Sequence, residues 1–392
     1  MTFRILSLDG GGIRGVISAT MLAHIEQQIN QPLHEYFDLI AGTSTGSILA
    51  SAIATGRSSQ EIIELYKQKG SVIFPYRSRF SFRRFPLLFR FGISAPKFSY
   101  EGLSQVLRDT LGETQLLDIA KPYILIMSYD TITRQPIVFK SWHKDPSYGN
   151  IPLWQACVCS ASAPTFFPAQ KLEKIINGQA QCATEDSITL CDEASAINNI
   201  YNNSQIRIIS GKGEGQTRTI TKYQGLKKRA VIDSPWHTIP DSTSSYSIKT
   251  IYSAIDGGVA ANNPSICAVA EAMRLGHKLE DISVLSLGTG DQTRIIPFEK
   301  AQSWGLLQWA QPIIGVLLDA SSNVHQYITN QIMDERVLRL QFKLDRELTG
   351  QPLSDDIDDV TPENINNLIK AAEVYMEKPR VQAQLQAFLS QQ

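Results

Sequence analysis

The sequence predicts an α/β protein with a mainly parallel sheet covered by helices on both faces, interrupted by a small β-rich insertion. Three observations lead to this fold class. Short apolar strands alternate with segments of helical periodicity on either side of residue 170. Glycine-rich turns join several strands to the next helix. Between residues 171 and 249 the composition shifts to Asn, Ser, Thr, Gly and β-branched residues.

The individual elements follow from periodicity and from start and stop signals. Apolar runs predict strands at 3–8, 37–41, 123–129, 136–140, 251–255, 282–287 and 337–342. Helical spacing predicts helices at 16–29, 47–54, 59–69, 100–110, 153–161, 265–275, 304–318 and 321–333. Ser58 with Glu61 forms a capping-box pattern, and Thr361 with Pro362 begins a C-terminal helix.

Composition bounds the class of protein. The 392 residues are 43% hydrophobic and 19% charged, as in a globular protein with a sizeable core. A net charge of -1 argues against a nucleic-acid polymer as partner. The five cysteines lack zinc-ligand spacing, so reduced thiols are expected and neither a metal nor a cofactor is predicted.

The N-terminus and the apolar segments bear on localisation. Met1 leads directly into a strand, without the pattern of a signal peptide. The uncharged segment 301–318 barely reaches membrane-spanning length and contains glutamines and a proline. We therefore expect a cytoplasmic protein, with peripheral contact at the inner membrane face as an option.

Residues 42–46, Gly-Thr-Ser-Thr-Gly, fit the pattern G-x-S-x-G. A buried strand precedes them and a helix follows, as in a nucleophile elbow that holds an exposed serine at a sharp turn. Gly42 and Gly46 would avoid a clash between a Cβ and the neighbouring backbone. The pattern therefore predicts Ser44 as a nucleophile, the alternative being an ordinary Gly/Ser turn.

A second glycine-rich loop lies between the first strand and the first helix, at residues 9–15, Asp-Gly-Gly-Gly-Ile-Arg-Gly. Bare backbone N–H groups in such a loop can approach an anionic oxygen closely. We interpret the loop as an oxyanion hole, with donors from Gly10, Gly11 and Gly12. Arg14 would support the loop or the anion, or else be a surface ion-pair partner. Gly10-x-Gly12-x-x-Gly15 also fits a dinucleotide fingerprint, but no ribose-binding acid follows about twenty residues on.

The base that would activate Ser44 is not an obvious histidine. Of the six histidines, His277 and His325 follow Ser44 and Asp256 in the order of a Ser-acid-His triad, but neither ends a strand. Asp256 does end an apolar strand and precedes Gly257 and Gly258, which would allow a close approach to the elbow. A partly desolvated carboxylate beside the serine hydroxyl could be the base directly. The alternative for residues 256–258 is a plain turn.

A basic and aromatic segment, residues 71–97, contains no acidic residue. Arginines on lipid headgroups and rings in the interface would suit an anionic membrane surface. The predicted membrane contacts are Arg77, Arg79, Phe80, Phe82, Arg83 and Arg84. In the alternative, the segment is an irregular loop whose rings pack on the core.

The insertion holds three predicted short strands, 206–209, 217–221 and 229–232, and a hairpin turn at 211–215. Gly213 and Gly215 fit that turn better than a phosphate cradle, since no helix follows. We predict a discontinuous catalytic domain at 1–172 and 250–345, the insertion at 173–249 and a C-terminal helical extension at 346–392. The partner of the insertion is not predicted.

Taken together, the motifs resemble those of the patatin-like phospholipase family. Residues 9–15, 42–46 and 256–258 carry the resemblance, and residues 160–168, 262–264 and 286–290 resemble the family's flanking signatures. The resemblance implies a three-layer α/β/α sandwich and a metal-free lipid acyl hydrolase with a Ser–Asp dyad. It implies Ser44 as nucleophile, Asp256 as base, Gly10 to Gly12 as oxyanion loop, and as supporting residues Asp9, Arg14, Gly15, Gly42, Gly46, Gly257 and Gly258.

The same resemblance implies membrane glycerolipids or phospholipids as substrates. The insertion departs from the family pattern and resembles a small β module of phage virion proteins. A second hypothesis therefore keeps the fold but makes the protein a latent effector or binding module, activated by a nucleotide or a partner. A third is a nucleotide-binding protein that uses the first glycine loop.

Overall fold

The computed structural model describes residues 2–78, 80–142, 150–309 and 312–390. Its centre is a sheet of five parallel strands in the order β13-β12-β1-β2-β3. These strands are β1 (Phe3–Leu8), β2 (Leu39–Thr43), β3 (Tyr123–Asp130), β12 (Ile282–Leu287) and β13 (Val337–Leu340). Two strands pair antiparallel with β3, namely β4 (Gln135–Lys140) and the end of β11 (Ser245–Asp256). The fold is therefore α/β with a mainly parallel, mixed sheet.

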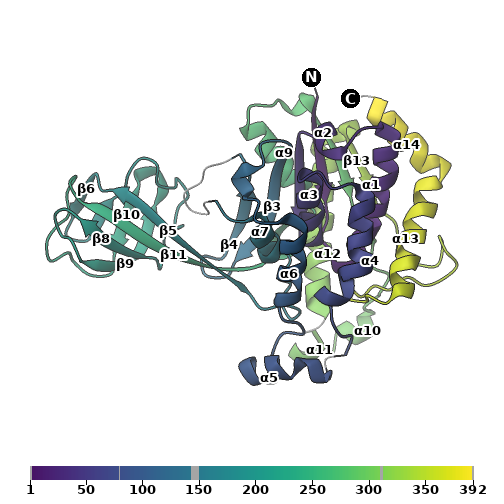
Figure 1. Ribbon diagram of the computed structural model, residues 1–392, viewed down its shortest axis with the longest axis horizontal. Coiled ribbons are helices and arrows are strands. Elements are labelled where there is room, and N and C mark those ends of the chain that lie inside the picture. The colour runs from purple at the N-terminus through teal and green to yellow at the C-terminus, as the bar shows by residue number, and fades with distance from the viewer. Residues whose placement is uncertain (1, 79, 143–149, 310–311, 391–392) are drawn as a thin grey trace.

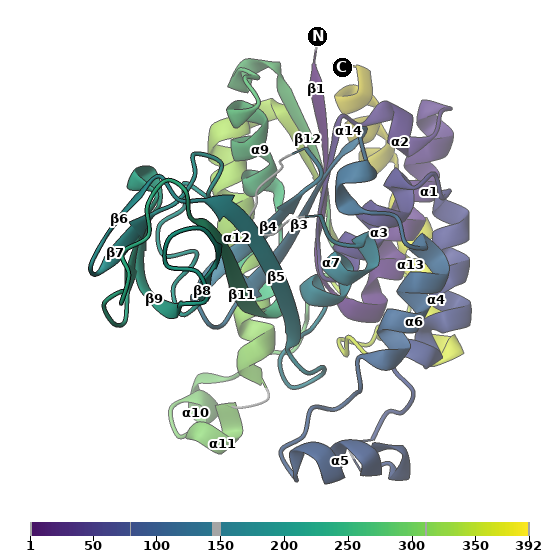
Figure 2. The same cartoon turned by 60° about the vertical axis from the view of Figure 1, so that its left-hand side comes forward.

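Helices cover both faces of this sheet (Figures 1 and 2). One face carries α1 (Gly15–Ile29), α3 (Thr45–Ala54), α4 (Ser59–Ile73), α6 (Glu101–Leu111) and α7 (Leu153–Ser160), with α13 (Pro362–Glu377) packed on α1. The other face carries α9 (Ser265–Arg274) and α12 (Pro312–Met333). Short helices α2 (Leu33–Tyr36) and α8 (Gly258–Ala261) and the terminal α14 (Pro379–Ser390) complete the body.

The parallel strands are mainly apolar because side chains on both of their faces are buried. In β1, Leu6 and Leu8 pack into the core under α1 and α3, whereas Phe3 and Ile5 pack into a second core under α9. In β2, Ile40 packs into the first core, whereas its neighbours Leu39 and Ala41 pack into the second core. This two-sided burial produces the three layers, α/β/α, that the alternation of strands and helices predicts.

A long two-stranded arm projects from the body and ends in a small β module (Figure 1, left). Its strands are β5 (Gln170–Gln179) and β11, paired antiparallel from Gln170–Ala254 to Gln179–Ser245. The module adds β6 (Cys182–Thr184), β7 (Ser187–Thr189), β8 (Gln205–Ser210), β9 (Thr217–Gln224) and β10 (Arg229–Ile232). The predicted hairpin of β8 and β9 is present, and β10 has the predicted bounds. The arm itself was not predicted, because β11 is twelve residues long and the sequence predicts a strand only at residues 251–255 of it.

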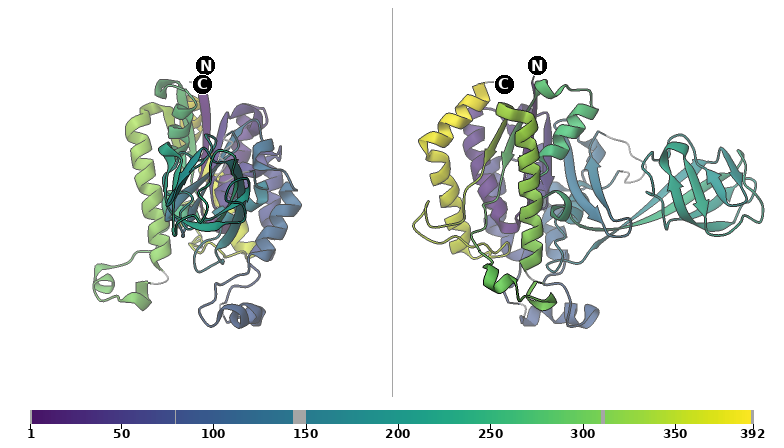
Figure 3. Two further views of the ribbon diagram at one scale, coloured as in Figure 1. Left: turned by 90° about the vertical axis from the view of Figure 1, so that its left-hand side faces the viewer. Right: turned by 180° about the vertical axis from the view of Figure 1, so that it is seen from behind.

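Four further elements differ from the sequence-based expectation. Residues 85–91 form a helix, α5 (Phe85–Phe91), where no helix was predicted and an irregular loop was one of the two alternatives. The helices expected at 304–318 and 321–333 are instead the short α11 (Leu306–Trp309) and the long α12, which is continuous through Asp319. Before them lies α10 (Phe298–Ala301). In all views α5, α10 and α11 project at the same end of the molecule (Figures 1–3).

That end also holds the carboxyl ends of the parallel strands. Strand β1 starts beside the N-terminal label and runs toward α5, α10 and α11 (Figure 2). Because β2, β3, β12 and β13 run parallel to β1, their carboxyl ends face the same way. Open α/β sheets build their sites at this edge.

Candidate active site

Ser44 sits between β2 and α3 in a strained backbone conformation. Its φ of 53° and ψ of −122° lie outside the regions that residues with a side chain favour. A Cβ on Gly42 would come within 2.3 Å of the Gly46 carbonyl oxygen, and one on Gly46 within 2.1 Å of the Leu8 carbonyl oxygen. The turn is therefore packed so tightly that only glycine fits on both sides of the serine, and the N-terminus of α3 begins at the nucleophile.

Asp256 reaches the same place from the end of β11. The segment that follows α7 holds it there, since the Asp256 N–H donates to the Ser162 carbonyl at 3.0 Å and the Gly257 N–H to the Ser160 carbonyl at 3.1 Å. The Ser160 hydroxyl in turn accepts a hydrogen bond from the Ser44 N–H at 2.8 Å. One short segment thus positions both ends of the candidate dyad.

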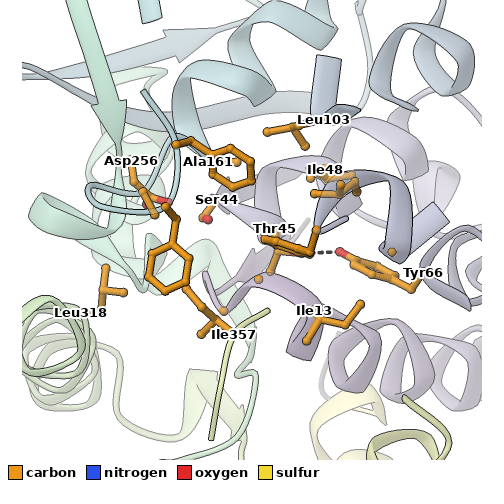
Figure 4. Close-up of a pocket in the computed structure, with 18 of the residues that line it drawn as sticks. Ile13, Ser44, Thr45, Ile48, Tyr66, Leu103, Ala161, Asp256, Leu318 and Ile357 are labelled. Atoms are coloured by element: carbon orange, nitrogen blue, oxygen red, sulfur yellow. Dashed lines mark hydrogen bonds between the residues drawn. The ribbon is translucent and has the colours of Figure 1, made fainter. Parts of the chain in front are cut away.

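The side chains of Ser44 and Asp256 face each other across the pocket (Figure 4). Asp256 is only 2% exposed, and burial raises the pKa of its carboxyl to about 6. A hydrogen bond from the Gly258 N–H, at 2.7 Å, and the Ser44 hydroxyl both favour the charged carboxylate and hold that pKa back. The arrangement gives a carboxyl group that is still ionised at neutral pH yet more basic than an ordinary aspartate.

The first glycine loop passes directly beside Ser44. A Cβ on Gly10 would lie 3.1 Å from the Ser44 Cβ, so the loop and the elbow are in contact. The Gly10 N–H already donates to the Asn262 carbonyl at 3.1 Å, and the Ile13 N–H donates to the Ile357 carbonyl at 2.8 Å. Among the described residues, no acceptor takes the N–H groups of Gly11 and Gly12. These two amides, and not that of Gly10, are the donors left for an anion.

Two buried charged residues keep this loop in place. Arg14 lies within the protein and not on the surface, and its guanidinium donates to the carbonyls of Gly11 and Gly290, both at 3.4 Å. Burial lowers the pKa of Arg14. Asp9 accepts two hydrogen bonds from Arg339, one of them at 2.9 Å, and a third from Ser322 at 3.0 Å. Arg14 and Asp9 therefore act on the loop and not on a reacting group.

A pocket with a cavity volume of about 50 Å³, partly open to solvent, surrounds the two facing side chains (Figure 4). Apart from Ser44, Asp256 and a few other polar groups, its wall is apolar. The apolar side chains come from both halves of the chain and include Ile13, Ile48, Ile73, Phe74, Leu103, Phe166, Phe167, Leu318 and Ile357. Thr45 and Tyr66 lie at one side, joined by a hydrogen bond between their hydroxyls. Such a wall suits an apolar group next to a nucleophile.

The histidines lie elsewhere. None of the five histidines in the described ranges lines this pocket, and His143 lies outside them. His277 stacks on Phe3, with ring centroids 3.9 Å apart. His325 is on α12 with its Nδ1 3.0 Å from the Asn263 carbonyl oxygen.

The predicted membrane contacts divide into four groups. Phe80, Phe82 and Arg83 are exposed. Arg84 is a wrong prediction, because its guanidinium is buried against the carbonyls of Ala95 and Pro96. Arg77 is exposed but forms an ion pair with Asp359, its nitrogen 3.0 Å from the carboxylate oxygen. Arg79 lies outside the described residues.

Sequence reasoning missed several residues that build the site. Ser160 and Ser162 lay in a recognised signature, but their contacts with Ser44 and Asp256 depend on the packing of α7 against β11. Ile357, in the C-terminal part of the chain, lines the pocket and fixes the glycine loop. No local signal marks it, because its role depends on contacts more than 300 residues away along the chain.

The chain is similar to known proteins over most of its length. The sequence model of the family described as "Patatin-like phospholipase" matches residues 6–192, which include the glycine loop and Ser44. "Patatin-like protein 2" of Oryza sativa subsp. indica is 26% identical over 414 residues, covering 95% of this chain and 84% of that protein. "Probable inactive patatin-3-Kuras 1" of Solanum tuberosum is also 26% identical, over 95% of this chain and 86% of that protein.

A solved structure, "Human GIVD cytosolic phospholipase A2", is similar at 13% identity, with a TM-score of 0.44 over 99% of this chain and 60% of that one. The family model and the relatives that span nearly the whole chain show that this protein is similar to the patatin-like phospholipase family.

Proposed function

We propose that this protein is a serine-dependent lipid acyl hydrolase that cleaves the carboxylic esters of glycerolipids or phospholipids. The observation that carries the proposal is the facing pair of Ser44 and Asp256 within an apolar pocket. Similarity to the patatin-like phospholipase family supports lipid hydrolysis in general. Since one relative is described as probably inactive, the case for activity depends on the residues of this chain's own site.

In the proposed first step, the Ser44 Oγ attacks the ester carbonyl carbon while its proton passes to the Asp256 carboxylate. The raised pKa of Asp256 supports this role, because a base is most effective when its pKa is near the operating pH. The negative charge that develops on the carbonyl oxygen would be held by the free N–H groups of Gly11 and Gly12. The N-terminal end of α3 adds a favourable dipole.

Collapse of the tetrahedral intermediate breaks the ester C–O bond. Asp256 returns its proton to the leaving alcohol oxygen, and the acyl group stays on Ser44. A water molecule then gives a proton to Asp256 and attacks the acyl-enzyme, which releases a fatty acid and restores the Ser44 hydroxyl. The proton and the acyl group are both accounted for without a histidine.

The apolar pocket supports an acyl chain as the substrate group nearest the nucleophile. Burying a hydrocarbon chain against Ile48, Phe74 and Leu103 is favourable by about 0.8 kcal/mol for each CH₂ group removed from water. A headgroup, which is polar, gains nothing from such a wall and would remain outside.

We also propose peripheral membrane contact through the end of the molecule that carries α5, α10 and α11. The rings of Phe82 and Phe89 are 96% and 89% exposed, and Leu306 is 88% exposed on α11. The segments that contain α5 and α10–α11 project at the same end of the molecule (Figures 2 and 3). The carboxyl end of β2, which precedes Ser44, faces this end. No helix among the described residues has the length and hydropathy needed to cross a bilayer.

The catalytic proposal predicts that Ser44→Ala and Asp256→Asn each remove phospholipid hydrolysis. In purified protein on mixed micelles, we expect kcat to fall by at least about a thousandfold for either variant, because nucleophile and base act as one unit. Fatty-acid release is the measurement. The double variant should lose little more than either single one.

Matched controls are Ser242→Ala and Asp281→Asn, which remove the same groups at exposed positions away from the pocket. Both should retain full activity. A histidine-dependent triad would reveal itself if His277→Ala or His325→Ala abolished turnover in a folded protein. That result would overturn the dyad.

A further inference from the structure

A second hollow lies on the other side of the catalytic pocket's wall. It has a volume of about 840 Å³ and lies between the end of α4, the segment of α5, the start of α6, α7 and the start of β5. The same two segments line both spaces with adjacent residues. Leu103 and Phe167 line the catalytic pocket, whereas the next residues in the chain, Ser104 and Pro168, line the hollow.

The charge of this hollow is strongly positive. Four basic side chains line it, Arg83, Arg90, Arg108 and Lys171, against one acidic side chain, Glu101. Lys171 is neutralised by an ion pair with Glu173. The three arginines form no ion pair with any described residue: Arg83 donates to the Pro75 carbonyl, Arg90 lies over Phe91 and Arg108 lies over Trp154. Three guanidinium groups are therefore left to take an anion.

The surroundings of the hollow point to a lipid and not to a soluble anion. The segment that supplies Arg83 and Arg90 also carries Phe80, Phe82 and Phe89, whose rings are almost fully exposed. Arginines bind phosphate oxygens through several donors, and neighbouring rings insert into the interface between headgroups and acyl chains. Only a phospholipid in a bilayer would satisfy the arginines and the rings together.

We propose that this basic hollow binds the phosphate headgroup of an anionic phospholipid, separately from the substrate ester at Ser44. The bound headgroup would hold the molecule on the membrane with only one layer of side chains between it and the catalytic pocket. This inference rests on the membrane contact proposed above, but not on the Ser44–Asp256 chemistry.

The test measures binding of the Ser44→Ala protein, which cannot consume the lipid, to sedimented vesicles at low salt. The probes are vesicles of phosphatidylcholine with and without phosphatidylglycerol. We expect tighter binding when phosphatidylglycerol is present. In the variant R83Q/R90Q/R108Q, the affinity for these vesicles should fall by about fivefold for each arginine removed, and the preference for phosphatidylglycerol should fall with it.

The control R207Q/R274Q/R380Q removes the same charge at exposed positions remote from the hollow. Equal losses in the two triple variants would overturn the proposal, because bulk charge alone would then explain binding. The proposal would also be overturned if inorganic phosphate or glycerol phosphate saturated the hollow, read from Trp154 fluorescence against a Trp154→Phe control, while binding to the phosphatidylglycerol vesicles stayed unchanged. Such a result would identify a site for free phosphate that takes no part in membrane binding.

Hydrolysis of a monomeric short-chain ester separates this inference from the proposed enzyme function. With Ser44 present, R83Q/R90Q/R108Q should hydrolyse that ester as fast as the wild type, which also shows that the variant is folded. Loss of vesicle preference with intact esterase activity supports the hollow. If the wild type were inactive but still bound phosphatidylglycerol vesicles, the proposed Ser44–Asp256 chemistry would be wrong, whereas the headgroup site would still stand.

Discussion

At the scale of single residues, the environment of Asp256 decides what this site can do. Its carboxyl is buried, and burial raises its pKa from an ordinary 3.8 to about 6. Opposing this, the Gly258 N–H and the Ser44 hydroxyl stabilise the carboxylate. Desolvation dominates, so the group is a stronger base than an exposed aspartate while remaining ionised near neutral pH.

This pKa predicts the pH dependence of hydrolysis. Since Asp256 must be ionised to accept the serine proton, kcat/KM should rise with pH up to about 6 and stay level above it. The measurement is a pH profile on a monomeric ester, repeated at several temperatures. A carboxyl group ionises with little enthalpy, so its inflection should stay in place. A marked shift with temperature would indicate a histidine instead.

The same shift has a consequence for stability. The folded protein holds the Asp256 proton more tightly than the unfolded chain does. Protonation of Asp256 therefore contributes to the free energy of unfolding below pH 3.8, and this contribution is lost as the pH rises to about 6. The loss corresponds to about 3 kcal/mol. Asp256→Asn should therefore be more stable than wild type above that pH, as a check that the inactive variant is folded. Equal stabilities at all pH values would contradict the raised pKa.

At the scale of elements, β11 connects the distal module to the active site in one strand. It begins at Ser245 in the module and ends at Asp256, while its partner β5 begins two residues after the segment 160–168 that holds Asp256 in place. Both strands of the arm are thus anchored at the dyad. The extensive contacts of β6 to β10 are with one another and with β11, and the module stands clear of the helices (Figure 1).

This arrangement predicts that the module can be removed without loss of the catalytic body. Ile176 pairs with Ile248, so replacing residues 177–247 by Asn-Gly would close the arm as a two-residue hairpin in the native register. We expect a folded protein with basal esterase activity within about threefold of the wild type, because Ser160, Ser162 and Asp256 keep their contacts. Circular dichroism and ester hydrolysis are the measurements.

A control for this deletion replaces the same residues by Gly-Gly-Gly, which shifts the register across the turn. It should fold less stably than the Asn-Gly variant. If the well-registered deletion were inactive although folded, the module would be required for activity, as the hypothesis of a latent effector demands. The division into catalytic body, insertion and C-terminal segment stays a prediction until then.

At the scale of the whole molecule, the apolar segments and the catalytic edge share one end. Segment 80–93 and segment 295–309 are separated by 200 residues of sequence, yet α5, α10 and α11 project in the same direction (Figure 3). Side chains this exposed gain nothing from the protein's own core. A bilayer at that end would bury them and bring its lipids to Ser44.

We therefore predict that F82S/F89S and L306S/L307S each weaken binding to vesicles of phosphatidylcholine alone. The loss should be about tenfold for each pair, given that a buried Phe or Leu side chain is worth about 1.5–3 kcal/mol and insertion is partial. Vesicle sedimentation of the Ser44→Ala protein is the measurement. Folding should be unaffected, because all four side chains are exposed.

Leu226→Ser is the matched control, since Leu226 is equally exposed but lies on the distal module. It should bind as the parent protein does. If Leu226→Ser weakened binding as much as either pair, the membrane would contact the module and not the catalytic end.

Local sequence predicted most of the elements and the candidate chemistry of the site. The alternation of apolar strands and helices indicates the layered fold, and β12 has the predicted bounds because its six residues are all buried. Three short motifs identify Ser44, Asp256 and the glycine loop, since tight turns with glycine on either side leave few other structures. The arginines and rings of residues 71–97 likewise indicate a surface for anions.

Only the tertiary structure decided which of these groups are free to act. Gly10 resembles Gly11 and Gly12 in sequence, but its N–H is taken by Asn262, which lies 252 residues further on. Arg84 resembles Arg83, but its guanidinium is buried against Ala95 and Pro96. Ile357 and Ser160 join the site through contacts that no local pattern encodes. Hydrogen-bond partners and burial are settled by distant parts of the chain, so residue types identify the chemistry but not its availability.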